Sequence, residues 1–258
     1  MPFDARVYNI LIASPSDVGE DRDIIVEAIH EWNSLNSQKE KTVILPVRWE
    51  THSSPSLGDR PQGILNDQFV KNCDLLIGLF WTRIGTHTGA AESGTVEEIE
   101  YFIESGKPVL LYFSDKQISL SEIDIEQYKK VKDFRSKIIP NGIVEGFKTT
   151  IEFREKVKRH LSLTMRKVID GTSTSSPEKI EAAKTTILPN IRKDTVYLED
   201  YYKEGITKSF LVKGNTTAIK DELKALGGRW NNKLEGWVFP AKRKIEIAEF
   251  IKEKVSAI

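Results

Sequence analysis

Residues 92–111 read ESGTVEEIEYFIESGKPVLL and place several carboxylates at the start of a predicted helix. Ser93 or Thr95 is a suitable helix N-cap, and Glu97 and Glu98 fall in the first turn, where negative charge is favoured. Capping alone accounts for these acidic residues. A side chain early in a helix that follows a strand can also project over the strand ends, and we expect Glu98 to do so. Two carboxylates beside one ligand suit chemistry at an N-glycosidic carbon, where one attacks or stabilises the sugar centre and another group handles the proton.

A second group of candidate residues follows the predicted strands. In an open parallel sheet, ligands bind outside the carboxyl ends of the strands, so binding residues are expected in the loops that follow them. These loops contain the stretches SPSD, ETHSSPSLGDRPQG, WTRIGTHTGAAESGT and SDKQ. The candidate binding residues in them are Ser14, Ser16, Asp17, Trp81, Arg83, Ser93, Gly94 and Thr95.

The sequence leaves alternatives for each of these loop residues. Trp81 could stack on a flat ring and Arg83 could pair with a phosphate, or both could pack within their own loop. Ser14 or Ser16 could cap the helix that follows. The backbone N–H groups of the same turn could instead hold a phosphate, which the carboxylate of Asp17 would oppose.

Alternating apolar and amphipathic segments position these residues within residues 1–168. We expect strands at 7–13, 42–49, 73–81, 107–113 and 142–147, and helices at 21–35, 61–72, 93–106, 121–138 and 149–168. This alternation predicts βαβ units and an α/β fold, with a parallel sheet of about five strands covered by helices on both faces. Pro46 favours an edge position for the second strand.

The composition changes after residue 168. Residues 169–194 are rich in Ser, Thr and small residues and predict a linker. Residues 195–258 predict a small α+β domain. Its expected elements are a strand at 206–214, a helix at 216–228, a hairpin at 229–239 and a helix at 241–255.

The small domain carries the stretch LGGRWNNKLEGWVF, whose aromatic residues Trp230, Trp237 and Phe239 are suited to its core. It resembles a small LGGRWN…GW module appended to unrelated bacterial proteins, a resemblance that implies no activity. A basic patch could bind a nucleic acid or a nucleotide, and its members are Lys233, Lys242, Arg243 and Lys244. We expect contact with a partner protein, a ligand or a second copy of the chain there in preference to a nucleic acid.

Composition limits the classes of function. Lys plus Arg equals Asp plus Glu at 38 each, so the overall charge indicates no polyanionic partner. The single cysteine, Cys73, allows no intramolecular disulfide and favours a reducing compartment. Four histidines and one cysteine show no metal-site spacing, so no metal is expected. Without an apolar run of membrane-spanning length or a signal sequence, we expect a cytoplasmic protein with no membrane contact.

The stretch NCDLLIGLF followed by residues 92–111 resembles the nucleoside 2-deoxyribosyltransferase family. That family has a strand with an Asp, a Gly-Thr-x-x-Glu helix, and then Gly-Lys-Pro before the next strand. The resemblance implies that Glu98 is the nucleophile toward the sugar carbon. It assigns the two further acidic positions to Asp74 and Glu92, which would position the ribose hydroxyls or the proton.

The opening VYNILIASPSDVGEDRD is similar to the start of TIR domains, and above all to the SPSDV-type TIR-like domains of the DUF4062 class. The resemblance covers residues 5–165 and implies a flavodoxin-like sheet with a catalytic glutamate on a helix beside it. It also implies NAD as a substrate rather than a cofactor, self-association, and a role in bacterial antiviral defence. Two departures weigh against deoxynucleoside specificity: no tyrosine follows Tyr8 on the first strand, and Glu100 stands where a glycine is usual.

Three functional hypotheses follow. The first is a hydrolase that cleaves the N-glycosidic bond of a nucleotide, with NAD as its substrate. The second is a nucleoside hydrolase or 2-deoxyribosyltransferase. The third is a non-catalytic interaction module in which Glu97 and Glu98 only cap a helix. The direction in which Glu98 points, into a cleft or to solvent, discriminates between the enzymes and the module.

Overall fold

The protein was analysed as a computed structural model, which describes residues 2–49, 61–68, 70–119, 121–172, 177–203 and 206–255. Its larger part is a five-stranded sheet in which all neighbouring strands are parallel. The strands are β1 (Arg6–Ala13), β2 (Thr42–Val47), β3 (Leu75–Phe80), β4 (Val109–Ser114) and β5 (Glu145–Phe147). Their order, β2-β1-β3-β4-β5, is that of flavodoxin-like sheets, which confirms the predicted α/β fold class.

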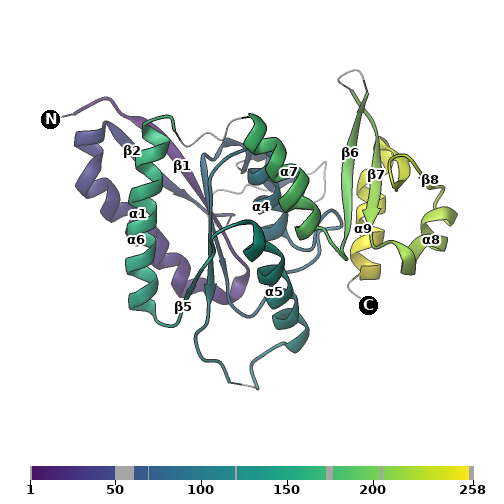
Figure 1. The fold of residues 1–258 in the computed structure, drawn as a ribbon, viewed down its shortest axis with the longest axis horizontal. Coiled ribbons are helices and arrows are strands. Elements are labelled where there is room, and N and C mark those ends of the chain that lie inside the picture. Colours follow the sequence, from purple (N-terminus) through teal and green to yellow (C-terminus); the bar gives the residue numbers. More distant parts are fainter. Residues whose placement is uncertain are drawn as a thin grey trace.

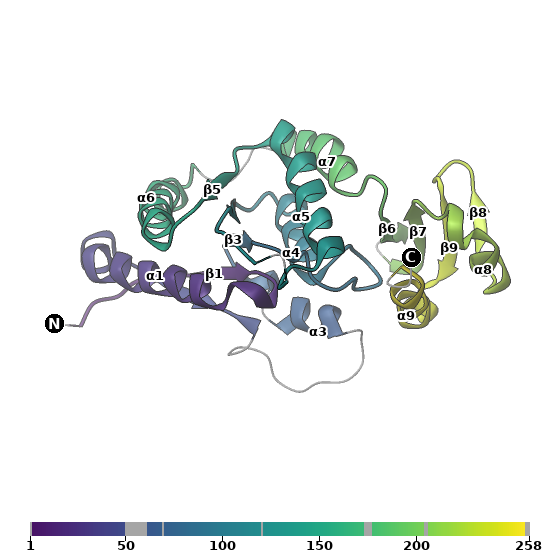
Figure 2. The same ribbon diagram turned by 90° about the horizontal axis from the view of Figure 1, so that it is seen from below.

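Helices cover both faces of this sheet (Figure 2). On one face, α1 (Gly19–Glu40) and α6 (Thr150–Ile169) pack against each other and share one core cluster with the sheet. On the other face, α3 (Pro61–Gln68), α4 (Gly94–Glu104) and α5 (Ile125–Ile138) contribute to a second cluster. Side chains that leave alternate sides of each strand fill both clusters, so each strand needs apolar residues in both directions.

The central and edge strands differ as their sequences predict. All six residues of β3 are buried, because helices cover both of its faces. β2 lies at one edge of the sheet and contains Pro46, which has no N–H group to donate to a further strand. Short 3-10 turns join some of the elements, at Ser16–Val18, Val70–Asn72, Ile139–Asn141, Thr217–Ile219 and Ala241–Arg243.

A helix that the sequence analysis did not expect, α7 (Pro177–Ile191), occupies most of the segment predicted as a linker. It packs against α4 and α5, and its residues Leu188 and Ile191 are buried. The segment 169–194, predicted as a Ser/Thr-rich linker, is therefore helical over most of its length. The first half of this segment is rich in Ser and Thr, so the apolar residues near the C-terminal end of the helix were not recognised as a helical pattern. The division of the chain into domains at residues 168 and 195 stays a prediction.

The C-terminal unit is a four-stranded antiparallel sheet with two helices, and it lies beside α7 and α5 (Figure 1). The strand order is β6-β7-β9-β8. The elements are β6 (Val196–Lys203), β7 (Ile206–Gly214), α8 (Lys220–Ala225), β8 (Arg229–Asn231), β9 (Gly236–Pro240) and α9 (Lys244–Val255). The structure confirms a strand at 206–214, the hairpin and the terminal helix, and it adds β6, which was not expected.

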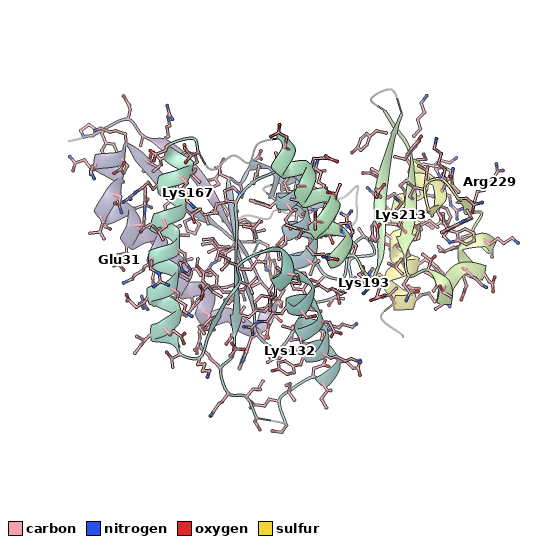
Figure 3. The ribbon with its side chains drawn as sticks, in the orientation of Figure 1. Glu31, Lys132, Lys167, Lys193, Lys213 and Arg229 are labelled. Carbon is pink, nitrogen blue, oxygen red and sulfur yellow. The ribbon has the colours of Figure 1, made fainter. Side chains whose placement is uncertain are left out.

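The aromatic residues of this unit differ in burial, and several of its basic residues form ion pairs. Phe239 is fully buried and stacks on Phe210, whereas Trp230 is half exposed at the edge strand β8. Within the expected basic patch, Lys244 pairs with Asp200 and Arg243 pairs with Glu246. Figure 3 shows Lys213 and Arg229 as two further cations of this unit, and Lys213 pairs with Glu199. These ion pairs offset part of the local positive charge.

No helix among the described residues combines the length and the apolar character that crossing a bilayer requires.

Candidate functional site

A pocket of about 370 Å³ opens at the carboxyl edge of the parallel sheet. We call it the carboxyl-edge pocket. It brings together seven of the sequence-predicted site residues, namely Ser14, Ser16, Arg83, Ser93, Gly94, Thr95 and Glu98. They come from the loops after β1 and β3 and from the start of α4, which is where a parallel α/β sheet places its ligands.

Glu98 points into this pocket and is only 8% exposed. Gln62 of α3 donates a hydrogen bond from Nε2 to Glu98 Oε1 over 3.0 Å. Gly94 allows this contact, because a Cβ atom at that position would lie 2.4 Å from Gln62 Oε1. The Gly-Thr turn therefore leaves room for the side chain that holds the carboxylate in place.

The neighbouring glutamate has a different environment. Glu97 accepts hydrogen bonds from Asn66 Nδ2 at 2.9 Å and from Thr88 Oγ1 at 2.7 Å, away from the carboxyl-edge pocket. The helix cap itself is Ser93, whose hydroxyl accepts the N–H of Val96 at 3.2 Å. Two adjacent carboxylates on α4 thus separate into one that braces a loop and one that faces the pocket.

The loop after β1 contains two buried oxygen atoms that are without a hydrogen-bond partner in the described part of the chain, Ser14 Oγ and Asp17 Oδ1. Ser14 lines the pocket, whereas Asp17 braces it from outside. Asp17 Oδ2 accepts the N–H and the hydroxyl of Thr82, both at 2.9 Å, and the N–H of Arg83 at 3.1 Å. Buried polar atoms normally have partners, so the unpaired hydroxyl of Ser14 suits a ligand contact.

Three predicted site residues lie elsewhere. Trp81 packs toward the α1–α6 face, and its Nε1 donates to the carbonyl of Lys116 at 3.4 Å, which agrees with the alternative in which it packs on its neighbours. Asp74 precedes β3 and accepts the N–H of Asn9 at 2.8 Å. Since a residue before a parallel strand lies at its amino end, Asp74 does not lie beside Glu98 at the carboxyl edge of the sheet.

Glu92 is the third of these residues. It lines a separate cavity on the other side of the loop that precedes α4, next to the C-terminal unit. Ser93, the next residue, lines the carboxyl-edge pocket. Successive side chains of an extended segment leave opposite sides, which separates the Glu92 carboxylate from Glu98.

Two of the pocket residues that the sequence analysis did not select, Trp49 and Gln62, have side chains suited to a role in the site. Trp49 follows β2 and is half exposed, and Gln62 lies in the first turn of α3. Trp49 was placed inside the expected strand 42–49, whereas β2 ends at Val47, so the rule that singled out Ser14 and Arg83 did not reach it. Gln62 falls in the stretch that follows the second expected strand, but it was not singled out there, because its role depends on how α3 packs against α4.

Glu100, which stands where a glycine was expected from the resemblance, ties α4 to the segment after α7. Its carboxylate accepts Arg192 Nε at 2.9 Å, and Arg192 also pairs with Glu104 at 2.7 Å. Burial raises the pKa of Glu100, while the guanidinium of Arg192 opposes that shift. This residue therefore has a structural role on the side of α4 that faces away from the pocket.

Within the described residues, no group of three or more His, Cys, Asp or Glu side chains is placed to hold a metal ion. The pocket has one cationic side chain among its described lining, Arg83, which is half exposed and lies 4.0 Å from Asp124. The fold and this site define an α/β protein of flavodoxin-like strand order with a carboxylate-bearing pocket at the carboxyl edge of its sheet.

Comparison with known families adds one assignment. Residues 9–162 of the 258-residue chain match the family described as "Domain of unknown function (DUF4062)". Because the match covers more than half of the chain, the protein belongs to this family. The matched segment contains the whole sheet except the beginning of β1, together with Glu98. No curated protein sequence matches the chain.

Several solved structures are weakly similar. A conserved protein from Enterococcus faecalis V583 is 14% identical, with 60% of this chain and 99% of that chain covered and a TM-score of 0.34. The translation elongation factor SelB from Methanococcus maripaludis is 9% identical, with 82% and 42% covered and a TM-score of 0.37. The flavodiiron protein from Giardia intestinalis is 7% identical, with 72% and 38% covered and a TM-score of 0.32. These scores are too low to support an argument about function.

Proposed function

We propose that the carboxyl-edge pocket cleaves an N-glycosidic bond in a nucleotide, with NAD as the substrate and Glu98 as the reacting carboxylate. The observation that carries this proposal is the placement of Glu98, which is buried, lines the pocket and is held by Gln62. A glutamate that only capped the helix would not need such a position. The cap is already supplied by Ser93.

The make-up of the pocket favours a substrate with a cationic leaving group. Glu98 is the single acidic side chain among the described residues that line it. A neutral nucleoside needs a second group to protonate the departing base. The nicotinamide of NAD carries a positive charge, so it leaves as a neutral molecule without a proton. One carboxylate among the described lining residues therefore suits NAD better than a nucleoside.

In the proposed reaction, the bond between the ribose C1′ and the nicotinamide nitrogen breaks, and its electron pair neutralises the nitrogen. The carboxylate of Glu98 bonds to C1′ or stabilises its positive charge. Water then attacks C1′ and releases one proton, and where Glu98 has bonded to C1′ that bond breaks and returns the carboxylate, which gives nicotinamide and ADP-ribose. A buried carboxylate does this best when a fixed donor holds it in one geometry, and Gln62 provides that donor.

Other pocket residues fit the remainder of a dinucleotide. Arg83 can pair with the diphosphate, and the unpaired hydroxyl of Ser14 can contact a ribose or phosphate oxygen. Trp49 offers a half-exposed indole on which a nicotinamide or adenine ring can stack. From the TIR resemblance alone, the proposal extends to a self-associating enzyme of bacterial antiviral defence.

The test is base release from NAD, NMN, adenosine and 2′-deoxyadenosine, at a protein concentration high enough for self-association. We expect release from NAD or NMN and little from the two nucleosides, and we expect Glu98→Gln to abolish it. Release from the nucleosides alone would favour the hydrolase or deoxyribosyltransferase hypothesis. Absence of release from every substrate, with and without cell extract as a source of activator, would favour the interaction module.

A further inference from the structure

The second cavity, which Glu92 lines, lies where the C-terminal unit meets the loop before α4, and we call it the junction cavity. Its volume is about 430 Å³, within the usual range for small-molecule sites. The loop residues Gly85 and Thr86 line both this cavity and the carboxyl-edge pocket. Figure 3 shows Lys193 in the segment that connects α7 to β6. The next two residues of this segment, Asp194 and Thr195, line the cavity.

One wall of the junction cavity carries an unsatisfied carboxylate. Glu92 Oε2 is buried and has no hydrogen-bond partner among the described residues. Burial raises the pKa of this carboxyl, and the charges of Lys137 and Lys130 oppose the shift. A buried carboxylate oxygen without a donor is unfavourable, so its position in a cavity points to a donor that a ligand supplies.

The cavity also carries a cation and an apolar surface. Lys130 of α5 lines it, and within the described part of the chain the amine of Lys130 forms no ion pair with Glu92. Ile219 and Val255 of the C-terminal unit provide apolar lining. A carboxylate, an ammonium group and an apolar wall together complement a molecule with both charges and an apolar part.

His87 forms a fixed part of the wall. Its Nε2 lies 3.2 Å from the carbonyl of Val196, and its Nδ1 accepts the N–H of Gly89 at 2.9 Å. Both ring nitrogens are therefore engaged within the protein. The charged side chains that line the cavity are then Glu92, Lys130 and the exposed Asp194, while His87 joins the loop to β6.

We propose that the junction cavity binds a small zwitterion, a free amino acid with an apolar side chain, whose ammonium contacts Glu92 and whose carboxylate contacts Lys130. Its side chain lies against Ile219 and Val255. Because the walls come from both units, such a ligand joins the C-terminal unit to the loop that also lines the carboxyl-edge pocket. This site is separate from Glu98 and does not depend on the proposed reaction.

The test is calorimetric titration of the full chain with L-leucine and L-phenylalanine. Phenethylamine and 3-phenylpropanoate serve as probes that carry only the ammonium or only the carboxylate. We expect saturable binding of at least one amino acid, and binding weaker by about tenfold or more for each single-charge probe. Glu92→Gln should weaken amino-acid binding by about tenfold or more, and Lys130→Met should do the same.

Glu199→Gln is the control, because this glutamate lies outside the junction cavity and should leave binding unchanged. Since Glu92→Gln removes a buried unpaired carboxylate, its melting temperature should equal or exceed that of the wild type, so lost binding is not lost folding. Absence of saturable binding by both amino acids up to about 10 mM would overturn the proposal. Binding unaffected by both cavity substitutions would overturn it as well.

Discussion

The carboxyl-edge pocket and the junction cavity share the loop residues Gly85 and Thr86, yet they arise in different ways. The first is built by strands and helices that follow one another along the chain, at the place where every parallel sheet presents its loops. The second exists because α7 returns across α4 and α5 and presents β6 to that loop. The carboxyl-edge pocket therefore depends on the order of neighbouring elements along the chain. The junction cavity depends on how the C-terminal unit packs against the loop before α4.

The largest effect should come from breaking the ion pair between Arg192 and Glu100, which positions the segment that leads into the junction cavity. Arg192→Ala leaves the Glu100 carboxylate buried without its partner, and losing one partner of a buried pair costs about 3–5 kcal/mol. We expect a matching decrease in the free energy of unfolding, measured with urea. The control is Lys213→Ala, which removes a more exposed ion pair with Glu199 and should cost under about 1 kcal/mol. Equal costs for the two variants would show that Arg192 does not anchor the junction.

A smaller effect should follow from acid. Burial lowers the pKa of His87 to about 4, against the effect of its hydrogen bond to the carbonyl of Val196. Lys130 and Lys252 add to this lowering, and Glu97 opposes it. Because the folded protein holds the neutral imidazole, its contribution to stability is complete above the ordinary pKa of 6.5. That contribution is lost as the pH falls from there through 4.

The measurement is the free energy of unfolding of the wild type and of His87→Asn at pH 7 and pH 4.5. The stability advantage of the wild type should shrink by about 2 kcal/mol between these two values. A constant advantage would mean that His87 is not held neutral at the junction. If base release is detected, its rate per folded molecule should change by a smaller factor between pH 7 and pH 4.5 than the equilibrium constant of unfolding does.

The smallest effect concerns the two tryptophans that follow strands. Trp49→Ala should raise the KM for NAD by about tenfold, or ~1.4 kcal/mol, with little change in melting temperature, because the indole is half exposed in the pocket. Trp81→Ala should lower the melting temperature and leave KM nearly unchanged, since this indole packs into the core. The reverse pattern would restore the sequence-based expectation for Trp81.

The sequence predicts the sheet and the Glu98 helix well, because their periodicity and turn residues are local. The sequence does not predict which residues meet in one site when that depends on their three-dimensional placement. Asp74 comes just before β3, and Glu98 lies on the helix that follows it. The two residues therefore lie toward opposite ends of this strand. Glu92 and Ser93 are neighbours, yet they line different cavities. Neither composition nor spacing carries this information.

The C-terminal half shows the same limit. The burial of Leu188 and Ile191 depends on where α7 docks, and the strand β6 becomes recognisable only through its pairing with β7. A Ser/Thr-rich segment followed by Val-Tyr-Leu-Glu-Asp carries a weak local preference, so tertiary contacts decide its structure.

The most direct test of the central claim compares the two adjacent glutamates of α4 in single-turnover release of nicotinamide from NAD. Glu98→Gln should reduce the rate by about a thousandfold or more, equivalent to ~4 kcal/mol of transition-state stabilisation. Glu97→Gln, which changes a carboxylate that braces Thr88 and Asn66, should reduce it by less than about tenfold. Equal rates for wild type and Glu98→Gln, with both proteins folded, would contradict the assignment of Glu98 as the reacting carboxylate.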